Sequence, residues 1–291
     1  MSPPTIPAAG AVEHRTRGIV AFLVIAFGLA WLPFLPALFG SSAPGSIFMP
    51  FAPAIACFIV RKWVTREGFG DSGLRPGFRH WRLYLLAVAW PFAATLVYVP
   101  LALALGVAPD GFAVPWGLGD PSLVALLSWP LIAFALAPII LGEEFGWRGY
   151  LQIRLFADQP LRAALATGVI WGVWHYPMIL AGGQNTADRL QTLLIFPVAT
   201  TTLSVFLGWL RLRTGSVWPG SVAHASNNAT ENNLSRLTFT GDSSGTLPAS
   251  ATWPILLAEA LVLLGIVAVD HLRRQPRRTA LAPDAPVLDQ V

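Results

Sequence analysis

Residues 18–39 read GIVAFLVIAFGLAWLPFLPALF, a run without a charged side chain. About 20 predominantly apolar residues are enough to cross a bilayer as a helix. Arg15 and Arg17 precede the run, no clear small-residue cleavage site ends it, and further apolar runs follow. These features favour a signal anchor that stays in the membrane over a cleaved signal peptide.

The composition of the whole chain supports a membrane protein. Of 291 residues, 54% are hydrophobic and 12% are charged, whereas a soluble domain has about 25% charged residues. So little charge excludes a soluble globule, and the high hydrophobicity excludes intrinsic disorder. The sequence therefore predicts an all-α, polytopic membrane helix bundle of about eight spans, at roughly 18–39, 46–63, 81–106, 122–142, 162–182, 189–210, 215–232 and 253–270.

The basic residues predict the orientation of these spans. Of the 19 Lys and Arg residues, only Arg189 and Arg236 fall on the side opposite the two termini. Because cytoplasmic loops are enriched in Lys and Arg, we expect both termini in the cytoplasm. The net charge of +4 then reflects topology, and we expect no nucleic-acid partner. Arginine-rich, lysine-poor short loops are typical of an integral protein of a bacterial plasma membrane.

Three polar clusters interrupt the apolar spans. They read GEEFGWR at 142–148, WGVWH at 171–175 and HASNN at 224–228. Ionisable groups inside a bilayer are costly, so they are candidates for function. Each cluster alone has a plain structural explanation, as a salt bridge or an interhelical hydrogen bond, but three ordered clusters are hard to explain as independent packing features.

Helical geometry relates the clusters to one another. Glu144 and Arg148 are four residues apart and can pair on one face, whereas Glu143 points away from that face. His224 and Asn228 are also four apart. His175 lies within the fifth span, where Gly168 and Gly172 allow another helix to approach closely. The three spans can therefore converge on one buried polar chamber.

These side chains suit hydrolysis by an activated water. A buried glutamate can take a proton from water, a neutral imidazole can orient that water, and a His–Asn pair can hydrogen-bond to an oxyanion. Glu143, His175 and His224 could instead hold a catalytic zinc with one open position. No organic cofactor is indicated. A non-catalytic immunity or scaffold protein and a transporter are the alternative functions.

The motifs resemble those of the CAAX protease and bacteriocin-processing (CPBP) family of intramembrane endopeptidases, which includes the type II CAAX prenyl endopeptidases. The family pattern is Glu-Glu-x-x-x-Arg, then an aromatic residue four positions before a histidine, then His-x-x-x-Asn. This chain has Glu143, Glu144 and Arg148, then Trp171 and His175, then His224 and Asn228. Trp171 departs from the usual Phe but keeps an aromatic ring.

The resemblance implies a peptide hydrolase that works inside the membrane. Glu143 would activate water, His175 would position it, and His224 with Asn228 would stabilise the oxyanion. Glu144, paired with Arg148, would support the site. The family is often labelled metalloprotease, so zinc stays open. Substrates would be peptides or membrane-protein segments, since prenylated tails are the eukaryotic case.

The sequence also predicts how the chain is divided. We expect a cytoplasmic tail at 1–17, N-terminal transmembrane helices at 18–121 and a CPBP-like catalytic core at 122–232. A last transmembrane helix at 253–270 and a disordered cytoplasmic tail at 271–291 complete the chain. The fourth helix is expected to continue beyond the membrane core, into the 150s.

Overall fold

The structure is a computed structural model of the chain, and it describes residues 9–39, 44–107, 121–181, 186–238 and 249–274. The described residues contain helices and no strand, which confirms the all-α prediction. The α-helices are α1 (Ala9–Trp31), α2 (Ala52–Ile59), α3 (Trp81–Ala104), α4 (Pro121–Gly146), α5 (Pro160–Trp174), α6 (Tyr176–Ala181), α7 (Thr186–Thr214), α8 (Trp218–Thr238) and α9 (Ala249–Arg274). Shorter 3₁₀ or π segments are η1 (Leu32–Phe39), η2 (Pro44–Phe51), η3 (Val60–Val64), η4 (Phe78–His80) and η5 (Trp147–Leu151).

Several boundaries differ from those expected. The first helix begins at Ala9 rather than near 18, and its α-helical part ends at Trp31, since Pro33 disfavours helix at the residue before it. As predicted, α4 continues directly into η5. The helix α9 runs to Arg274, while residues 275–291 of the expected disordered tail lie outside the described residues.

Among the described residues, six helical stretches are long and apolar enough to cross a membrane, against eight expected. The expected spans at 46–63 and 215–232 are the two that do not qualify. The first is divided into η2, α2 and η3, so no long apolar helix forms. The second corresponds to α8, whose sequence is rich in Ser and Asn.

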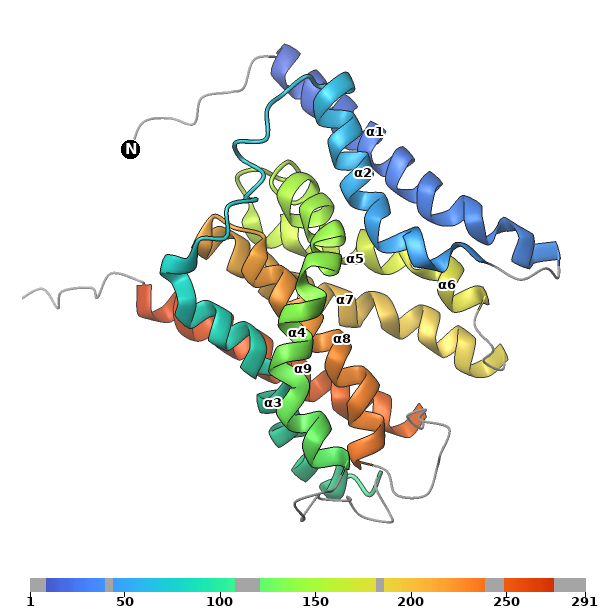
Figure 1. Cartoon of the computed structure of the whole chain (residues 1–291), viewed down its shortest axis with the longest axis vertical. Helices are drawn as coiled ribbons and strands as arrows, with labels where there is room; N and C mark the ends of the chain where they lie inside the picture. The colour runs from blue at the N-terminus through green and yellow to red at the C-terminus, as the bar shows by residue number, and fades with distance from the viewer. Residues whose placement is uncertain (1–8, 40–43, 108–120, 182–185, 239–248, 275–291) are drawn as a thin grey trace, which may run out of the picture.

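Contacts place one end of each of these two segments. Arg17, in α1, donates a hydrogen bond to the carbonyl of Val64, so η3 ends beside the start of α1. The helices α1 and α2 lie side by side in Figure 1. Trp218, at the start of α8, donates to the carbonyl of Leu74, and α9 ends where Asp270 meets Arg213 of α7. The structure therefore gives six membrane-length helices among the described residues, and crossings by these two segments stay a prediction of the charge pattern.

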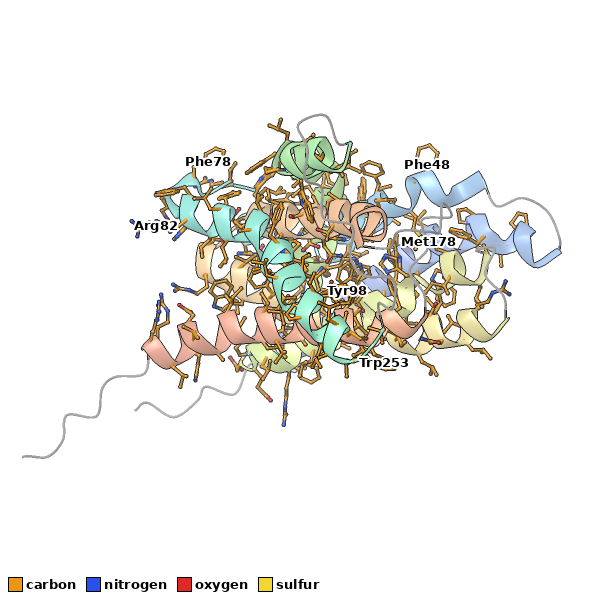
Figure 2. The ribbon with its side chains drawn as sticks, turned by 90° about the horizontal axis from the view of Figure 1, so that it is seen from below. Phe48, Phe78, Arg82, Tyr98, Met178 and Trp253 are labelled. Carbon is orange, nitrogen blue, oxygen red and sulfur yellow. The ribbon has the colours of Figure 1, made fainter. Side chains whose placement is uncertain are left out.

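The outer surface of the bundle is apolar, as a bilayer requires. Leu96, Leu131 and Leu194 expose 76%, 74% and 76% of their surface, each on a membrane-length helix. Figure 2 shows Phe48 and Phe78 standing outward from the ribbon. In water such surface would drive aggregation, so these contacts are suited to lipid.

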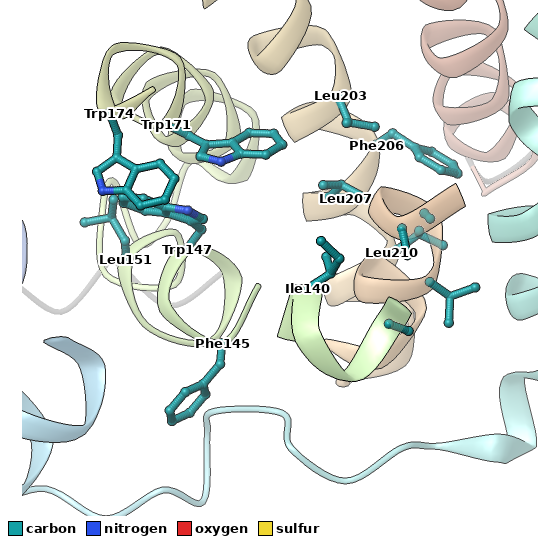
Figure 3. Packing of buried hydrophobic residues seen from close by; sticks show 14 of the residues in the cluster. Ile140, Phe145, Trp147, Leu151, Trp171, Trp174, Leu203, Phe206, Leu207 and Leu210 are labelled. Atoms are coloured by element: carbon teal, nitrogen blue, oxygen red, sulfur yellow. The ribbon is translucent and has the colours of Figure 1, made fainter. Parts of the chain in front are cut away.

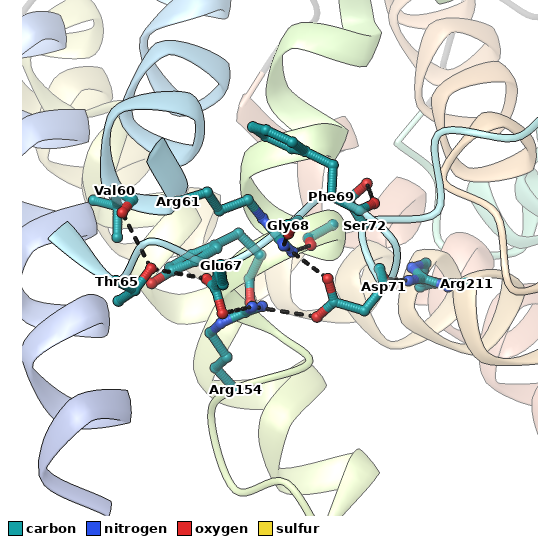
Figure 4. A network of polar contacts seen from close by, with 12 residues as sticks. Val60, Arg61, Thr65, Glu67, Gly68, Phe69, Asp71, Ser72, Arg154 and Arg211 are labelled. Carbon is teal, nitrogen blue, oxygen red and sulfur yellow. Dashed lines mark hydrogen bonds and ion pairs between the residues drawn. The ribbon is translucent and has the colours of Figure 1, made fainter. Parts of the chain in front are cut away.

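Loops that the charge pattern places in the cytoplasm meet in one network, which we call the basic face (Figure 4). Arg61 is fully buried and donates to Asp71 (2.7 Å) and to the carbonyl of Gly149 (2.9 Å). Arg154 pairs with Glu67 (2.8 Å) and Asp71 (3.2 Å). These contacts hold the loop after η3 against the end of η5.

Asp71 predicts a pH dependence of stability. Burial alone would raise the pKa of Asp71, but the hydrogen bond and charge of Arg61, with the charge of Arg154, lower it below its ordinary 3.8. The ionised carboxylate therefore stabilises the fold above pH 3.8, and this contribution disappears as pH falls through the lower folded value. We expect Asp71→Asn to lower the melting temperature at pH 7, with the difference from wild type shrinking below about pH 4. A difference independent of pH would contradict this.

Glycines bring the helices around the future site into close contact. A β-carbon at Gly142 would lie 2.6 Å from the carbonyl oxygen of Pro50, and one at Gly172 would lie 2.6 Å from the Cα of Pro197. One at Gly168 would lie 2.5 Å from the Cα of Thr201. The prediction that Gly168 and Gly172 allow close approach is therefore confirmed, and α7 is the helix that approaches.

We expect Gly146→Val to destabilise the bundle by about 1–3 kcal/mol, because a buried contact would be overpacked. A β-carbon there would lie 2.7 Å from the carbonyl carbon of Pro53 in α2, and this backbone cannot rotate away. Gly265→Val in α9 is the control, since nothing lies within 4 Å of its β-carbon position. Equal melting temperatures for the two variants would contradict the expected clash.

Candidate active site

The end of α4 places two carboxylates in the interior. Glu144 is completely buried and Glu143 is 5% exposed. One turn later, Arg148 in η5 donates through Nη1 to Oε1 of Glu144 at 2.9 Å. The pair predicted from the four-residue spacing is therefore present, and both partners are removed from solvent.

Glu144 also connects α4 to α8. Its Oε1 accepts a hydrogen bond from Nδ1 of His224 at 3.0 Å. The guanidinium of Arg148 lies 4.6 Å from the centre of the Trp171 ring, on α5. The ion pair, the hydrogen bond from His224 and the cation–π contact thus join α4, α5 and α8 around the carboxylate of Glu144.

Glu143 faces a different partner, as the helical geometry predicts. Its Oε2 accepts a hydrogen bond from the indole Nε1–H of Trp171 at 2.7 Å. Within the described part of the chain, the structure gives no hydrogen bond to Oε1. Trp171 thus orients the carboxylate and leaves one oxygen for a water, a role that its aromatic character alone did not predict.

His175 lies within the membrane span, as expected, but at a break between α5 and α6. Pro177 has no N–H to bond the carbonyl of Val173, so the α-helical pattern is interrupted here. The ring Nδ1–H donates to the carbonyl of Trp171 at 2.9 Å. In the neutral ring Nε2 is then an acceptor. Trp174 and Phe196 pack against the ring at 4.8 and 4.9 Å between centroids and hold its orientation.

The candidate catalytic side chains meet at a cavity of about 470 Å³. Glu143, His175, His224 and Asn228 line it, whereas Glu144 and Arg148 do not. The volume is within the usual range for ligand pockets. The structure therefore separates one group of residues that can touch a substrate from a second group that can only support them.

Aromatic and aliphatic side chains surround this polar group. Figure 3 shows Trp147, Trp171 and Trp174 together on one side, with Leu203 and Phe206 of α7 on the other. All five are buried. Such walls lower the local dielectric and strengthen the electrostatic interactions inside.

Sequence reasoning did not assign several residues that line the cavity. Asn227 occupies an unspecified position inside the third motif, and Thr200 and Met49 come from α7 and η2. Glu259 of α9 also lines the cavity. Its signal in the sequence was a lone acid in an apolar span.

The described residues do not form a metal site. No three His, Cys, Asp or Glu side chains among them are grouped so that they could hold a metal ion. Glu143, His175 and His224, the ligands expected for zinc, share the cavity but do not form such a group in this arrangement. Zinc therefore stays a prediction of the sequence.

The comparison with known families agrees with this geometry. Residues 123–230 match a family model described as type II CAAX prenyl endopeptidase Rce1-like. The resemblance seen in the motifs is thereby confirmed. The matched segment contains all seven residues singled out in the three motifs and runs from α4 into α8. The helices α1, α2, α3 and α9 lie outside the match, and no curated protein matches the chain.

Proposed function

We propose that this chain is an intramembrane endopeptidase that hydrolyses a peptide bond inside the bilayer. The observation that carries the proposal is the shared cavity, which is lined by a carboxylate, two imidazoles and an amide from α4, α5 and α8. The match to a CAAX endopeptidase family supports the same class of reaction. A bilayer-embedded cavity favours substrates that are peptides or segments of membrane proteins.

In the proposed reaction Glu143 is the general base. Its Oε1 removes a proton from a water, whose oxygen forms a bond to the carbonyl carbon of the substrate. His175 accepts a hydrogen bond from that water at Nε2, because its Nδ1–H is already donated to Trp171. The proton held by Glu143 then passes to the leaving nitrogen as the C–N bond breaks, which gives a carboxylic acid and an amine that ionise to a carboxylate and an ammonium group.

The oxyanion formed in this attack needs hydrogen-bond donors. The side-chain amide of Asn228 and Nε2 of His224 are the candidates, since both residues line the cavity. Donation from His224 Nε2 requires the doubly protonated ring, and the carboxylate of Glu144 at Nδ1 balances its charge. Glu144 thus acts through His224, while Arg148 keeps Glu144 in place.

A comparison of membrane proteomes tests the proposal and can reveal the substrate in the same experiment. Cells that make the wild-type protein are compared with cells that make Glu143→Gln, and new protein termini are mapped by mass spectrometry. We expect uncut precursors to accumulate in the variant, in the plasma membrane of a bacterial host. Identical termini in the two strains, with an unchanged phenotype, would favour a non-catalytic scaffold instead.

A further inference from the structure

The start of α3 carries a cluster of arginines that no acid of the chain balances. Residues 75–82, which we call the arginine turn, read RPGFRHWR, and residues 72–109 contain no Asp or Glu. Its three arginines, Arg75, Arg79 and Arg82, are exposed. Of the ion pairs formed among the described residues, none contains any of the three.

The neighbouring basic face shows the contrast. There Arg61 pairs with Asp71, and Arg154 pairs with both Glu67 and Asp71, so the chain supplies its own counter-charges. The arginine turn lies next along the sequence and has only like charges close together, which repel one another. An anion from outside the chain would therefore stabilise the arginine turn, whereas the basic face does not need one.

The arginine turn lies where the chain enters the bilayer, on the side that the charge pattern assigns to the cytoplasm. Phe78 begins the membrane-length stretch Phe78–Ala104. Phe78 and Trp81 expose 73% and 55% of their surface, and exposed aromatic rings at the end of a span lie at the level of the lipid headgroups. Figure 2 shows Phe78 and Arg82 at the same end of α3. One turn deeper, Leu85 is exposed and continues this surface as an apolar one.

Contacts within the arginine turn fix the path of its backbone. The hydroxyl of Tyr84, a buried residue of α3, donates a hydrogen bond to the carbonyl of Pro76. The ring of Phe78 lies 6.0 Å from that of Tyr84, measured between centroids. Gly77 turns the chain with a φ of +63°, a conformation that suits glycine. The turn is therefore held against the first helical turn of α3.

Two guanidinium groups are also held in place. The guanidinium carbon of Arg82 lies 5.5 Å from the centre of the Trp81 ring, a cation–π contact. Nε of Arg79 donates a hydrogen bond to Nε2 of His80 at 2.9 Å. Neither contact uses the terminal nitrogens of either guanidinium, so these N–H groups can donate to an oxyanion.

From this arrangement we infer that the arginine turn binds an anionic phospholipid of the cytoplasmic leaflet. Arg79 and Arg82 donate to the non-bridging oxygens of the headgroup phosphate, a charge-assisted contact that suits a guanidinium. The acyl chains lie along the exposed apolar surface that begins at Leu85. A zwitterionic lipid is disfavoured because its ammonium group would face the same arginines. The inference does not depend on the proposed peptidase function.

The test measures lipid binding to purified full-length protein in mild detergent, by native mass spectrometry during a lipid titration. Phosphatidylglycerol and phosphatidylcholine with identical acyl chains are compared. We expect wild type to bind phosphatidylglycerol about 10-fold or more tightly than phosphatidylcholine, since each basic residue near an anionic headgroup contributes about 5-fold. The double variant Arg79→Gln/Arg82→Gln should lose this preference and keep its binding of phosphatidylcholine.

Arg162→Gln/Arg273→Gln is the matched control. It removes two exposed arginines from the same side of the membrane, and neither is next to an aromatic residue in the sequence. It should keep the preference of wild type for phosphatidylglycerol. An equal loss in the two double variants would overturn the inference, because it would show a general effect of surface charge. Equal binding of the two lipids by wild type would overturn it without recourse to any variant.

A third ligand separates a lipid site from a site for any phosphate. Glycerol 3-phosphate carries the phosphate without acyl chains, and buried CH₂ groups add to the affinity of a lipid. We expect glycerol 3-phosphate at equal concentration to leave phosphatidylglycerol bound to wild type. Displacement of the lipid would overturn the assignment of the arginine turn to a phospholipid.

Discussion

Glu143→Gln is expected to lower peptide cleavage by the purified protein by about 10²–10⁴-fold, the usual contribution of a general base. Glutamine has nearly the same shape and keeps an oxygen that can accept the hydrogen bond from Trp171 Nε1. It cannot take a proton from water. The loss should therefore appear in kcat while the melting temperature and the oligomeric profile stay those of wild type.

Glu67→Gln is the control for this loss. Glu67 belongs to the basic face, where it pairs with Arg154 at 2.8 Å and does not line the cavity. We expect its activity to remain within a few-fold of wild type, since exposed ion pairs contribute little. Cleavage by Glu143→Gln at the wild-type rate would remove Glu143 from the reaction.

Arg148→Met is expected to produce the largest loss of stability, about 3–5 kcal/mol, because it leaves a buried carboxylate without its cation. Arg148 and Glu144 are 1% and 0% exposed. The substitution also removes the contact between the guanidinium and Trp171. The measurement is the free energy of unfolding in lipid or mild detergent, and activity should fall with it because Arg148 no longer holds Glu144 in place against His224.

Two further variants show whether the buried charge is the cause. Adding Glu144→Gln to Arg148→Met removes both charges and should recover much of the stability. Arg154→Met breaks pairs with the partly exposed Glu67 and Asp71 and should cost only about 0–1 kcal/mol. If Arg148→Met were no more destabilising than Arg154→Met, the pair would not support the site as we describe.

Local geometry explains what the sequence could predict about the site. The Glu144–Arg148 pair follows from a four-residue spacing, and the separation of Glu143 from that pair follows from the angle between adjacent helical residues. Gly168 and Gly172 predicted a close helix contact, because two small residues that are four positions apart lie on the same helical face. Each of these relations lies within one helix, so it can be predicted without knowing how the helices pack.

Relations between helices could not be predicted in this way. The bond from His224 to Glu144 joins residues 80 positions apart, and the bond from Trp171 to Glu143 joins residues 28 apart. Both depend on how α4, α5 and α8 are rotated against one another. Glu259 reaches the cavity from a helix with no motif, so its sequence showed only that a lone acid was present.

The number of passes shows the limit of hydropathy. The segment α8 carries His224 and Asn228, and the polar side chains that make it a candidate for catalysis also lower its hydropathy below that of a membrane helix. The charge asymmetry of the loops still predicts that this segment crosses, because that signal depends on the ends of a segment and not on its interior.

In the proposed reaction Glu143 activates a water inside this cavity. The most direct test of this step is peptide cleavage by purified wild type and Glu143→Gln in water enriched with oxygen-18, with the new C-termini analysed by mass spectrometry. We expect one oxygen-18 atom in each new carboxylate made by wild type and no new termini above background from the variant. New termini without the label, or equal labelling by the variant, would contradict the account.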